Sequence, residues 1–199
     1  MSTQAHIHTA WTTRETVITA VSAVVFGMIY LAWVQVWLLA QGLIGPIAMD
    51  IVFGLWFAGS TFNAYVVRKP GVALATAMIA VITQLLAGNP AGLILLVTGL
   101  VQGFGSELPF AFTGWRRYSW PVVLASGAAA AVMSFGYNWI RFDYGNLEPS
   151  LLLAMFAIRV TSGVVLGALV PRVFANLVRS TGVFAGLGID APLAAHGQR

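Results

Sequence analysis

Long runs of apolar residues dominate this sequence and constrain its fold more than any other feature. Each run has about 20 mostly apolar residues, the length that an α-helix needs to cross the hydrocarbon core of a membrane. Only 8% of the 199 residues are charged, whereas a soluble globular protein carries about 25%. So few charges cannot cover a surface that faces water. The sequence therefore predicts an integral membrane protein.

Six runs qualify as membrane spans, and short breaks that contain Gly, Pro or charged residues separate them. The expected spans are 17–39, 46–67, 71–87, 92–113, 119–140 and 151–174. This pattern predicts an all-α fold, a six-transmembrane-helix bundle over residues 17–178 with tails at 1–16 and 179–199. Residues 180–199 are rich in Gly, Ala and Pro. They are expected to form a loosely ordered tail, although the stretch STGVFAGLG could instead lie on the membrane surface.

The basic residues predict the orientation of the bundle. If six spans are drawn, eight of the ten Lys and Arg residues fall on the side of the two termini. Arg141 falls on the other side, and Arg159 lies inside a span. Because the cytoplasmic loops of membrane proteins carry an excess of Lys and Arg, both termini are expected in the cytoplasm.

Hydrogen-bonding side chains occur at a similar depth in four of the spans, in the half that faces outside. A charge or amide inside a membrane is costly, so it usually faces a partner, a cavity or a ligand. These groups either satisfy one another and contact headgroups, or they line a pocket that opens to the outside. Their convergence favours the pocket. The residues concerned are Asp50, Gln84, Asn89, Ser134, Tyr137, Asn138 and Arg141.

The stretch GLVQGFGSELPF, residues 99–110, places an amide, a hydroxyl and a carboxylate in one apolar run. Gln102 and Ser106 share a helix face, whereas Glu107 is rotated from Gln102 by about 140°. Glu107 lies nearer the cytoplasmic end. It either pairs with Arg159, since an unpaired buried charge is costly, or accepts hydrogen bonds from an amino group on a ligand.

Several kinds of chemistry have no support in the sequence. The chain has no cysteine, which excludes thiolate metal sites, and the His6-x-His8 pair has no third ligand nearby. It has no P-loop, because its one lysine, Lys69, precedes a proline. No side chains pair as a nucleophile and its base. We therefore expect no enzyme activity, no metal site, no cofactor bound by this chain and no nucleic-acid partner.

Five blocks of sequence carry a resemblance to a known family. They are GPIAMDIVFGLWF (45–57), RKPGVAL (68–74), LLAGNPAG (85–92), GLVQGFGSE (99–107) and IRVTSG (158–163). With them the sequence resembles the substrate-binding (S) components of energy-coupling factor (ECF) transporters from about residue 17 to 188. More specifically, it is similar to the YkoE-type S components, which are linked to thiamine and its hydroxymethylpyrimidine precursor.

The resemblance implies partners and a place in the cell. It implies a multi-pass protein of a bacterial or archaeal cell (inner) membrane that binds a vitamin from outside. Such a protein docks on a transmembrane coupling subunit driven by two cytoplasmic ATPases, which use the ATP. Small residues of the first helix often meet the coupling subunit in this family, in an A-x-x-x-A pattern. Ala20, Ala23 and Gly27 are the candidates here, although Val24 departs from the pattern.

The chemistry of thiamine fits the polar and aromatic residues of the spans. Its thiazolium cation suits an aromatic face such as Trp56 or Tyr137, and its aminopyrimidine suits carboxylate and amide partners. The expected ligand-binding residues are Asp50, Trp56, Gln84, Asn89, Gln102, Glu107, Tyr137 and Asn138. Arg159 would repel a cationic ligand, so it is assigned to a structural ion pair with Glu107 or Asp50.

Two other functions stay open at this point. The chain could be an S component for a different small vitamin. It could also be a membrane protein that does not transport, either an assembly scaffold or a small intramembrane enzyme. A scaffold would not need polar groups from four spans at one depth.

Overall fold

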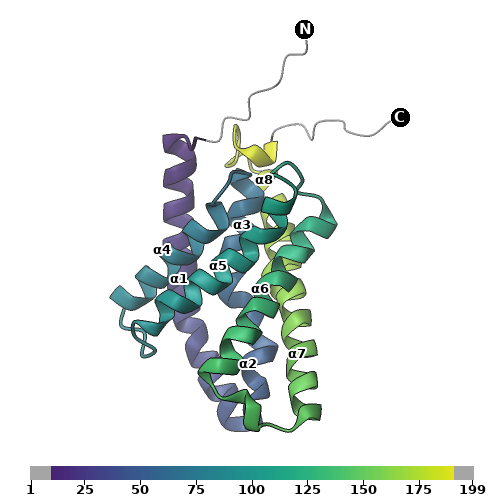
Figure 1. The fold of residues 1–199 in the computed structure, drawn as a ribbon. Coiled ribbons are helices and arrows are strands. Elements are labelled where there is room, and N and C mark those ends of the chain that lie inside the picture. Colours follow the sequence, from purple (N-terminus) through teal and green to yellow (C-terminus); the bar gives the residue numbers. More distant parts are fainter. Residues whose placement is uncertain (1–9, 191–199) are drawn as a thin grey trace, which may run out of the picture.

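The computed structural model describes residues 10–190, and within that range every regular element is a helix (Figure 1). His6, His8 and most of the two predicted tails lie outside the described residues. The elements, in chain order, are α1 (Thr13–Ile44), α2 (Ile47–Val52), η1 (Phe53–Phe57), α3 (Ala58–Val67), α4 (Val72–Leu86), α5 (Ile94–Phe112), α6 (Trp120–Arg141), η2 (Tyr144–Asn146), α7 (Pro149–Val164), η3 (Val165–Leu169), α8 (Val170–Arg179) and η4 (Gly188–Asp190).

Five helical stretches of the described chain are long and apolar enough to cross a membrane. They are Thr13–Ile44, Ile47–Val67, Ile94–Phe112, Trp120–Arg141 and Pro149–Arg179, and the shorter apolar helix Val72–Leu86 accompanies them. Each coincides with one of the sequence-predicted spans to within a few residues at most ends. The first and last helical stretches are longer at both ends than predicted. The protein is therefore a multi-pass integral membrane protein.

Helix α1 begins earlier than the predicted boundary at residue 17 because its N-terminus is well capped. The Thr12 side chain accepts from the backbone N–H of Glu15, and the Glu15 carboxylate accepts in return from the N–H of Thr12. This reciprocal capping box satisfies two N–H groups that a helix start leaves unpaired. The apolar side chains that α1 leaves exposed, including Val21, Val25 and Met28, form the surface that lipid would cover.

The second span is interrupted by a 3₁₀ turn, η1, between α2 and α3. Gly54 lies in this turn against the last span, where its N–H donates to the Ser162 hydroxyl at 3.0 Å. That hydroxyl in turn donates to the carbonyl of Ile51 at 2.8 Å. The last span has its own irregular turn opposite, the π-helical η3, in which Gly167 packs on the Phe57 ring. The two broken helices therefore interlock at mid-span.

Residues 180–190 correct the expectation of a loosely ordered tail. Phe184, Leu187 and Ile189 are buried in one core cluster with Val66 and Val67 at the end of α3. A loose tail would leave these apolar side chains in water, whereas packing removes roughly 2 kcal/mol of unfavourable exposure for each large one. The last turns of the described chain therefore form part of the folded domain.

The first turn of α1 and the last turn η4 lie at the same end of the molecule (Figure 1). Basic residues gather there too. Lys69 pairs with Glu15 at 3.2 Å, Arg179 pairs with Asp190 at 2.8 Å, and Arg14 donates to the carbonyl of Val183. The connection between α6 and α7 lies at the opposite end (Figure 1). Three of the eight basic residues expected on the side of the termini therefore lie together at this end.

Candidate ligand-binding pocket

A cavity of about 310 Å³ lies near the end of the bundle opposite the described termini. Its walls come from the second half of α1, from α2 and η1, from α4 and α5 with their connection, and from the end of α6. This volume is at the lower end of the range for small-molecule sites, about 300–1,000 Å³. The cavity therefore suits a compact ligand of one or two rings.

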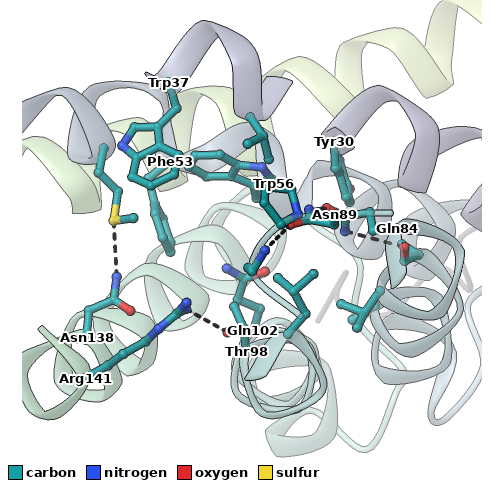
Figure 2. Close-up of a pocket in the computed structure, with 18 of the residues that line it drawn as sticks. Tyr30, Trp37, Phe53, Trp56, Gln84, Asn89, Thr98, Gln102, Asn138 and Arg141 are labelled. Carbon is teal, nitrogen blue, oxygen red and sulfur yellow. Dashed lines mark hydrogen bonds between the residues drawn. The ribbon is translucent and has the colours of Figure 1, made fainter. Parts of the chain in front are cut away.

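Aromatic side chains form one wall of the cavity (Figure 2). Trp56 meets the ring of Trp37 edge to face, with centroids 6.0 Å apart, and the ring of Phe53 at 6.1 Å. Tyr30 and Phe142 complete the aromatic lining. Flat π-faces of this kind hold planar heterocycles and organic cations.

The irregular turn η1 explains how two of these rings face the same cavity. Helix α1 holds the chain on either side of the turn through two hydrogen bonds. The Trp33 indole donates to the carbonyl of Val52 at 3.0 Å, and the Tyr30 hydroxyl accepts from the N–H of Gly59 at 2.6 Å. These bonds satisfy backbone groups that the break in the helix frees. In a 3₁₀ turn, side chains three residues apart lie directly above one another, so Phe53 and Trp56 face the same way.

Amide side chains face the aromatic wall (Figure 2). Asn89 donates to the Gln84 carbonyl oxygen at 3.0 Å and accepts from the N–H of Ala91 at 2.9 Å, so the pair is held in a fixed orientation. Asn138 donates to the Met49 sulfur at 3.4 Å. A thioether is a weak acceptor, so a ligand oxygen or nitrogen would be a better partner. Gln102 also lines the cavity.

Trp37 supplies a further polar group. Its Nε1–H is buried and meets no acceptor among the residues that the structure describes. A buried donor without a partner costs about 1–3 kcal/mol. This nitrogen has almost no accessible surface, so Trp37 lines the cavity with the rest of its ring.

Five of the eight sequence-predicted ligand-binding residues line this cavity: Trp56, Gln84, Asn89, Gln102 and Asn138. The residues expected from the sequence do not include Tyr30, Trp37, Phe53 or Thr98, which also line the cavity. Trp37 lies near the end of a predicted span, where aromatic residues commonly meet the membrane interface, and Tyr30 and Phe53 occur in apolar runs where an aromatic residue carries no special signal. Arg141 belongs to the polar set expected to converge on a pocket, and it lines the cavity although it is not one of the eight expected ligand contacts.

Asp50 is one of the three expected residues that the structure places outside the cavity. It is fully buried and accepts from Arg159 Nε at 2.5 Å, and Arg159 is fully buried as well. The guanidinium stacks on the Phe53 ring, with Cζ 4.3 Å from the ring centroid. Phe53 lines the cavity, so it separates the ion pair from any ligand. Of the two partners expected for Arg159, the structure shows Asp50.

Glu107 is the second, and it contacts neither the cavity nor Arg159. Its Oε1 accepts from the N–H of Gly71 at 2.8 Å and from the Trp115 indole, and its Oε2 accepts from the N–H of Ala73 at 2.8 Å. The N–H groups of Gly71 and Ala73 lie at the start of α4. Gly71 is the N-cap of that helix and has no side chain that could accept from the free N–H groups. The Glu107 carboxylate from α5 accepts from them instead, and its negative charge interacts favourably with the helix dipole.

Tyr137 and the proposed docking residues also lie away from the expected positions. Tyr137 is on α6 but does not line the cavity. Ala23 is fully buried, and Gly27 packs so closely on α4 that a Cβ would lie 2.7 Å from the carbonyl oxygen of Ala80. The small size of Gly27 therefore serves the contact between α1 and α4 inside this chain. Ala20 is partly exposed.

Among residues 10–190, no three or more His, Asp or Glu side chains gather as a metal site.

Comparison with known proteins places the chain among transporter components. A family model described as "ABC-type cobalt transport system, permease component" matches residues 14–133. A curated relative in Bacillus subtilis (strain 168), provisionally named an HMP/thiamine permease protein, YkoE, is 37% identical over 184 residues, which is 92% of each chain.

A solved structure titled "Crystal structure of an S-component of ECF transporter" superposes with a TM-score of 0.88. The two are 37% identical, and the match covers 90% of this chain and 91% of the other. The chain belongs to the family of ECF-transporter S components, of the YkoE type. Its relatives are transporter subunits and not enzymes, in agreement with the expectation of no catalytic activity.

Proposed function

We propose that this chain captures thiamine or its hydroxymethylpyrimidine precursor and delivers it to an ATP-driven coupling module. The observation that carries the proposal is the cavity itself, in which an aromatic wall faces several amides across about 310 Å³. The name of the Bacillus subtilis relative, an HMP/thiamine permease, supports the choice of ligand.

The cavity offers both kinds of contact that thiamine needs. The rings of Trp37, Phe53 and Trp56 suit the thiazolium cation and the flat pyrimidine. The amides of Gln102 and Asn138 can donate to ring nitrogens and accept from the exocyclic amine. No contact with Asp50 or Glu107 enters this arrangement.

The wider assembly follows from the same proposal. With six spans, of which α4 would be the third, both termini would lie in the cytoplasm of a bacterial or archaeal cell, and the cavity would open to the outside of the inner membrane. The grouped basic residues at the end of the described termini support this orientation. A transmembrane coupling subunit and two cytoplasmic ATPases would supply the energy, and this chain would bind no cofactor of its own.

A binding titration tests the proposal. The purified protein, alone and without ATP, should bind thiamine or hydroxymethylpyrimidine, and its tryptophan fluorescence should change on binding. Trp56→Ala removes a wall of the cavity and should weaken binding about tenfold or more, as expected for a buried aromatic contact. Trp139→Ala is the matched control, because Trp139 is 42% exposed and lies outside the cavity. Failure of the wild-type protein to bind either compound would remove this function.

A further inference from the structure

Arg141 is the charged side chain of the pocket, and it has no carboxylate beside it. Among the residues that the structure describes, the cavity lining contains this one arginine and no Asp, Glu or Lys. The proposed cargo thiamine is a cation. A positive charge in the wall of its pocket therefore needs an explanation.

The ion pairs found within residues 10–190 leave Arg141 out. They join Lys69 to Glu15, Arg159 to Asp50, and Arg179 to Asp190. The acidic residues closest in sequence do not lie within 4 Å of the guanidinium. The Asp143 carboxylate accepts instead from Asn146 at 2.6 Å, and Glu148 is exposed.

The contacts of Arg141 direct it toward the cavity. Its Nη1 donates to the Thr98 hydroxyl of α5 at 3.4 Å, a long bond, and both residues line the pocket (Figure 2). Its Cζ lies 4.9 Å from the centroid of the Phe142 ring, which is also part of the lining. Arg159 on α7 differs, because it is fully buried, pairs with a carboxylate and is separated from the cavity by the Phe53 ring. The guanidinium of Arg141 keeps donors available for an anion.

We propose that Arg141 binds the phosphate of a phosphorylated cargo, so that the pocket accepts a flat heterocycle carrying a phosphate monoester. This inference rests on the proposed function and specifies its substrate class. The guanidinium fork matches two oxygens of a phosphate in a bidentate, charge-assisted contact. The rings of the cargo would lie on the aromatic wall, and the ester would reach the partly exposed end of the cavity at Arg141.

The phosphate of a lipid headgroup has the same chemistry, since Arg141 ends α6. The bond to Thr98 favours the cargo as the source, because it turns the guanidinium toward α5 and a second residue that lines the cavity. Protein purified in a maltoside detergent, which contains no phosphate, separates the two sources.

The test compares wild type with Arg141→Gln and Arg141→Lys in maltoside. Thiamine, thiamine monophosphate, hydroxymethylpyrimidine and its monophosphate are titrated against each protein. Arg141→Gln should weaken binding of the two esters about tenfold or more, and thiamine itself should bind somewhat more tightly because a like charge is gone. Arg141→Lys should fall between, since it keeps the charge and loses the fork. Arg116→Gln, an exposed arginine outside the cavity, is the control.

Three results would overturn the inference. One is an equal loss of affinity for esters and unphosphorylated compounds in Arg141→Gln. Another is wild type that binds thiamine and rejects both esters, which leaves the proposed function intact. The third is an effect of Arg141→Gln on thermal stability that appears only in nanodiscs with anionic lipid, with ester affinity unchanged, which would assign Arg141 to a headgroup. If none of the four compounds binds wild type, the proposed function falls and this inference falls with it.

Discussion

At the scale of single residues, charged groups in the spans serve structure more than binding. The carboxylate of Glu107 accepts from the N–H groups of Gly71 and Ala73 at the start of α4. Gly71 has φ +80, a conformation that glycine adopts easily. Because glycine has no side chain, the N-cap of α4 has no acceptor of its own. The Glu107 carboxylate from α5 accepts these hydrogen bonds instead.

Replacing Glu107 should therefore reduce stability and spare the pocket. Glu107→Ala removes the cap and the charge at the helix N-terminus, at a cost of about 1–3 kcal/mol from the two effects together. Glu107→Gln keeps an acceptor and should cost less. Thermal denaturation in detergent measures both, and a thiamine titration serves as the control. A variant of unchanged stability that has lost its ligand affinity would contradict this assignment.

The buried pair of Asp50 and Arg159 leads to a prediction about paired substitutions. Asp50→Ala strands a fully buried guanidinium, and breaking such a pair costs about 3–5 kcal/mol. The double variant Asp50→Ala, Arg159→Met leaves no stranded charge, so it should be more stable than Asp50→Ala alone. Denaturation midpoints of the three proteins measure this. Equal destabilisation by the single and double variants would show that the unpaired charge of Arg159 is not the cause of the lost stability.

At the scale of elements, the close contact of the two broken helices shapes the pocket. η1 carries Phe53 and Trp56, and it lies on the last span through Gly54. A side chain at Gly54 would overlap the backbone carbonyl of Ser162. The aromatic wall of the pocket thus depends on a glycine that does not itself line the cavity.

Gly54→Ala should weaken ligand binding from outside the cavity. The added methyl group has no room, so η1 or α7 must shift, and the rings of Phe53 and Trp56 shift with them. We expect about a tenfold loss of affinity, the effect of small misplacements in a site, together with lower thermal stability. Gly136→Ala on α6 is the matched control because a Cβ there meets no atom within 4 Å. Equal ligand affinity of the two variants would show that the position of η1 does not determine the aromatic wall.

The sequence predicts the spans well and the site only in part, and the same elements show why. The length of an apolar run and the position of Gly and Pro depend on local physics, so five predicted runs match helices long enough to span, and the third matches the shorter apolar helix α4. The partners of a polar residue depend on packing between helices. Gln102 and Glu107 lie five residues apart, yet one lines the pocket and the other caps α4. No pattern within the chain distinguishes these roles without the neighbouring helices.

Whether small residues are exposed or buried also depends on packing. Ala23 and Gly27 form the spacing that suits either a second subunit or a neighbouring helix. The structure places α4 against Gly27. The exposed face of α1 includes the larger side chains of Val17, Val21 and Val24, so a contact of this helix with a coupling subunit would involve these side chains as well as small ones.

At the scale of the whole molecule, the orientation in the membrane decides whether the cavity can capture a ligand from outside. The cavity and the α6–α7 connection lie away from the end that carries the first turn of α1, η4 and the paired basic residues (Figure 1). Positive residues stay on the cytoplasmic side. The α6–α7 connection should therefore face the exterior.

Single cysteines can test this orientation because the natural chain contains none. Asn146→Cys lies in the α6–α7 connection, whereas Ser119→Cys and Ser180→Cys lie at the other end, and all three positions are exposed. A membrane-impermeant maleimide applied to intact cells should label Asn146→Cys at once. The other two variants should react only after the membrane is permeabilised, since a charged reagent cannot cross the hydrocarbon core. The reverse pattern would open the cavity to the cytoplasm, and capture of a vitamin from outside would then be physically impossible for this arrangement of helices.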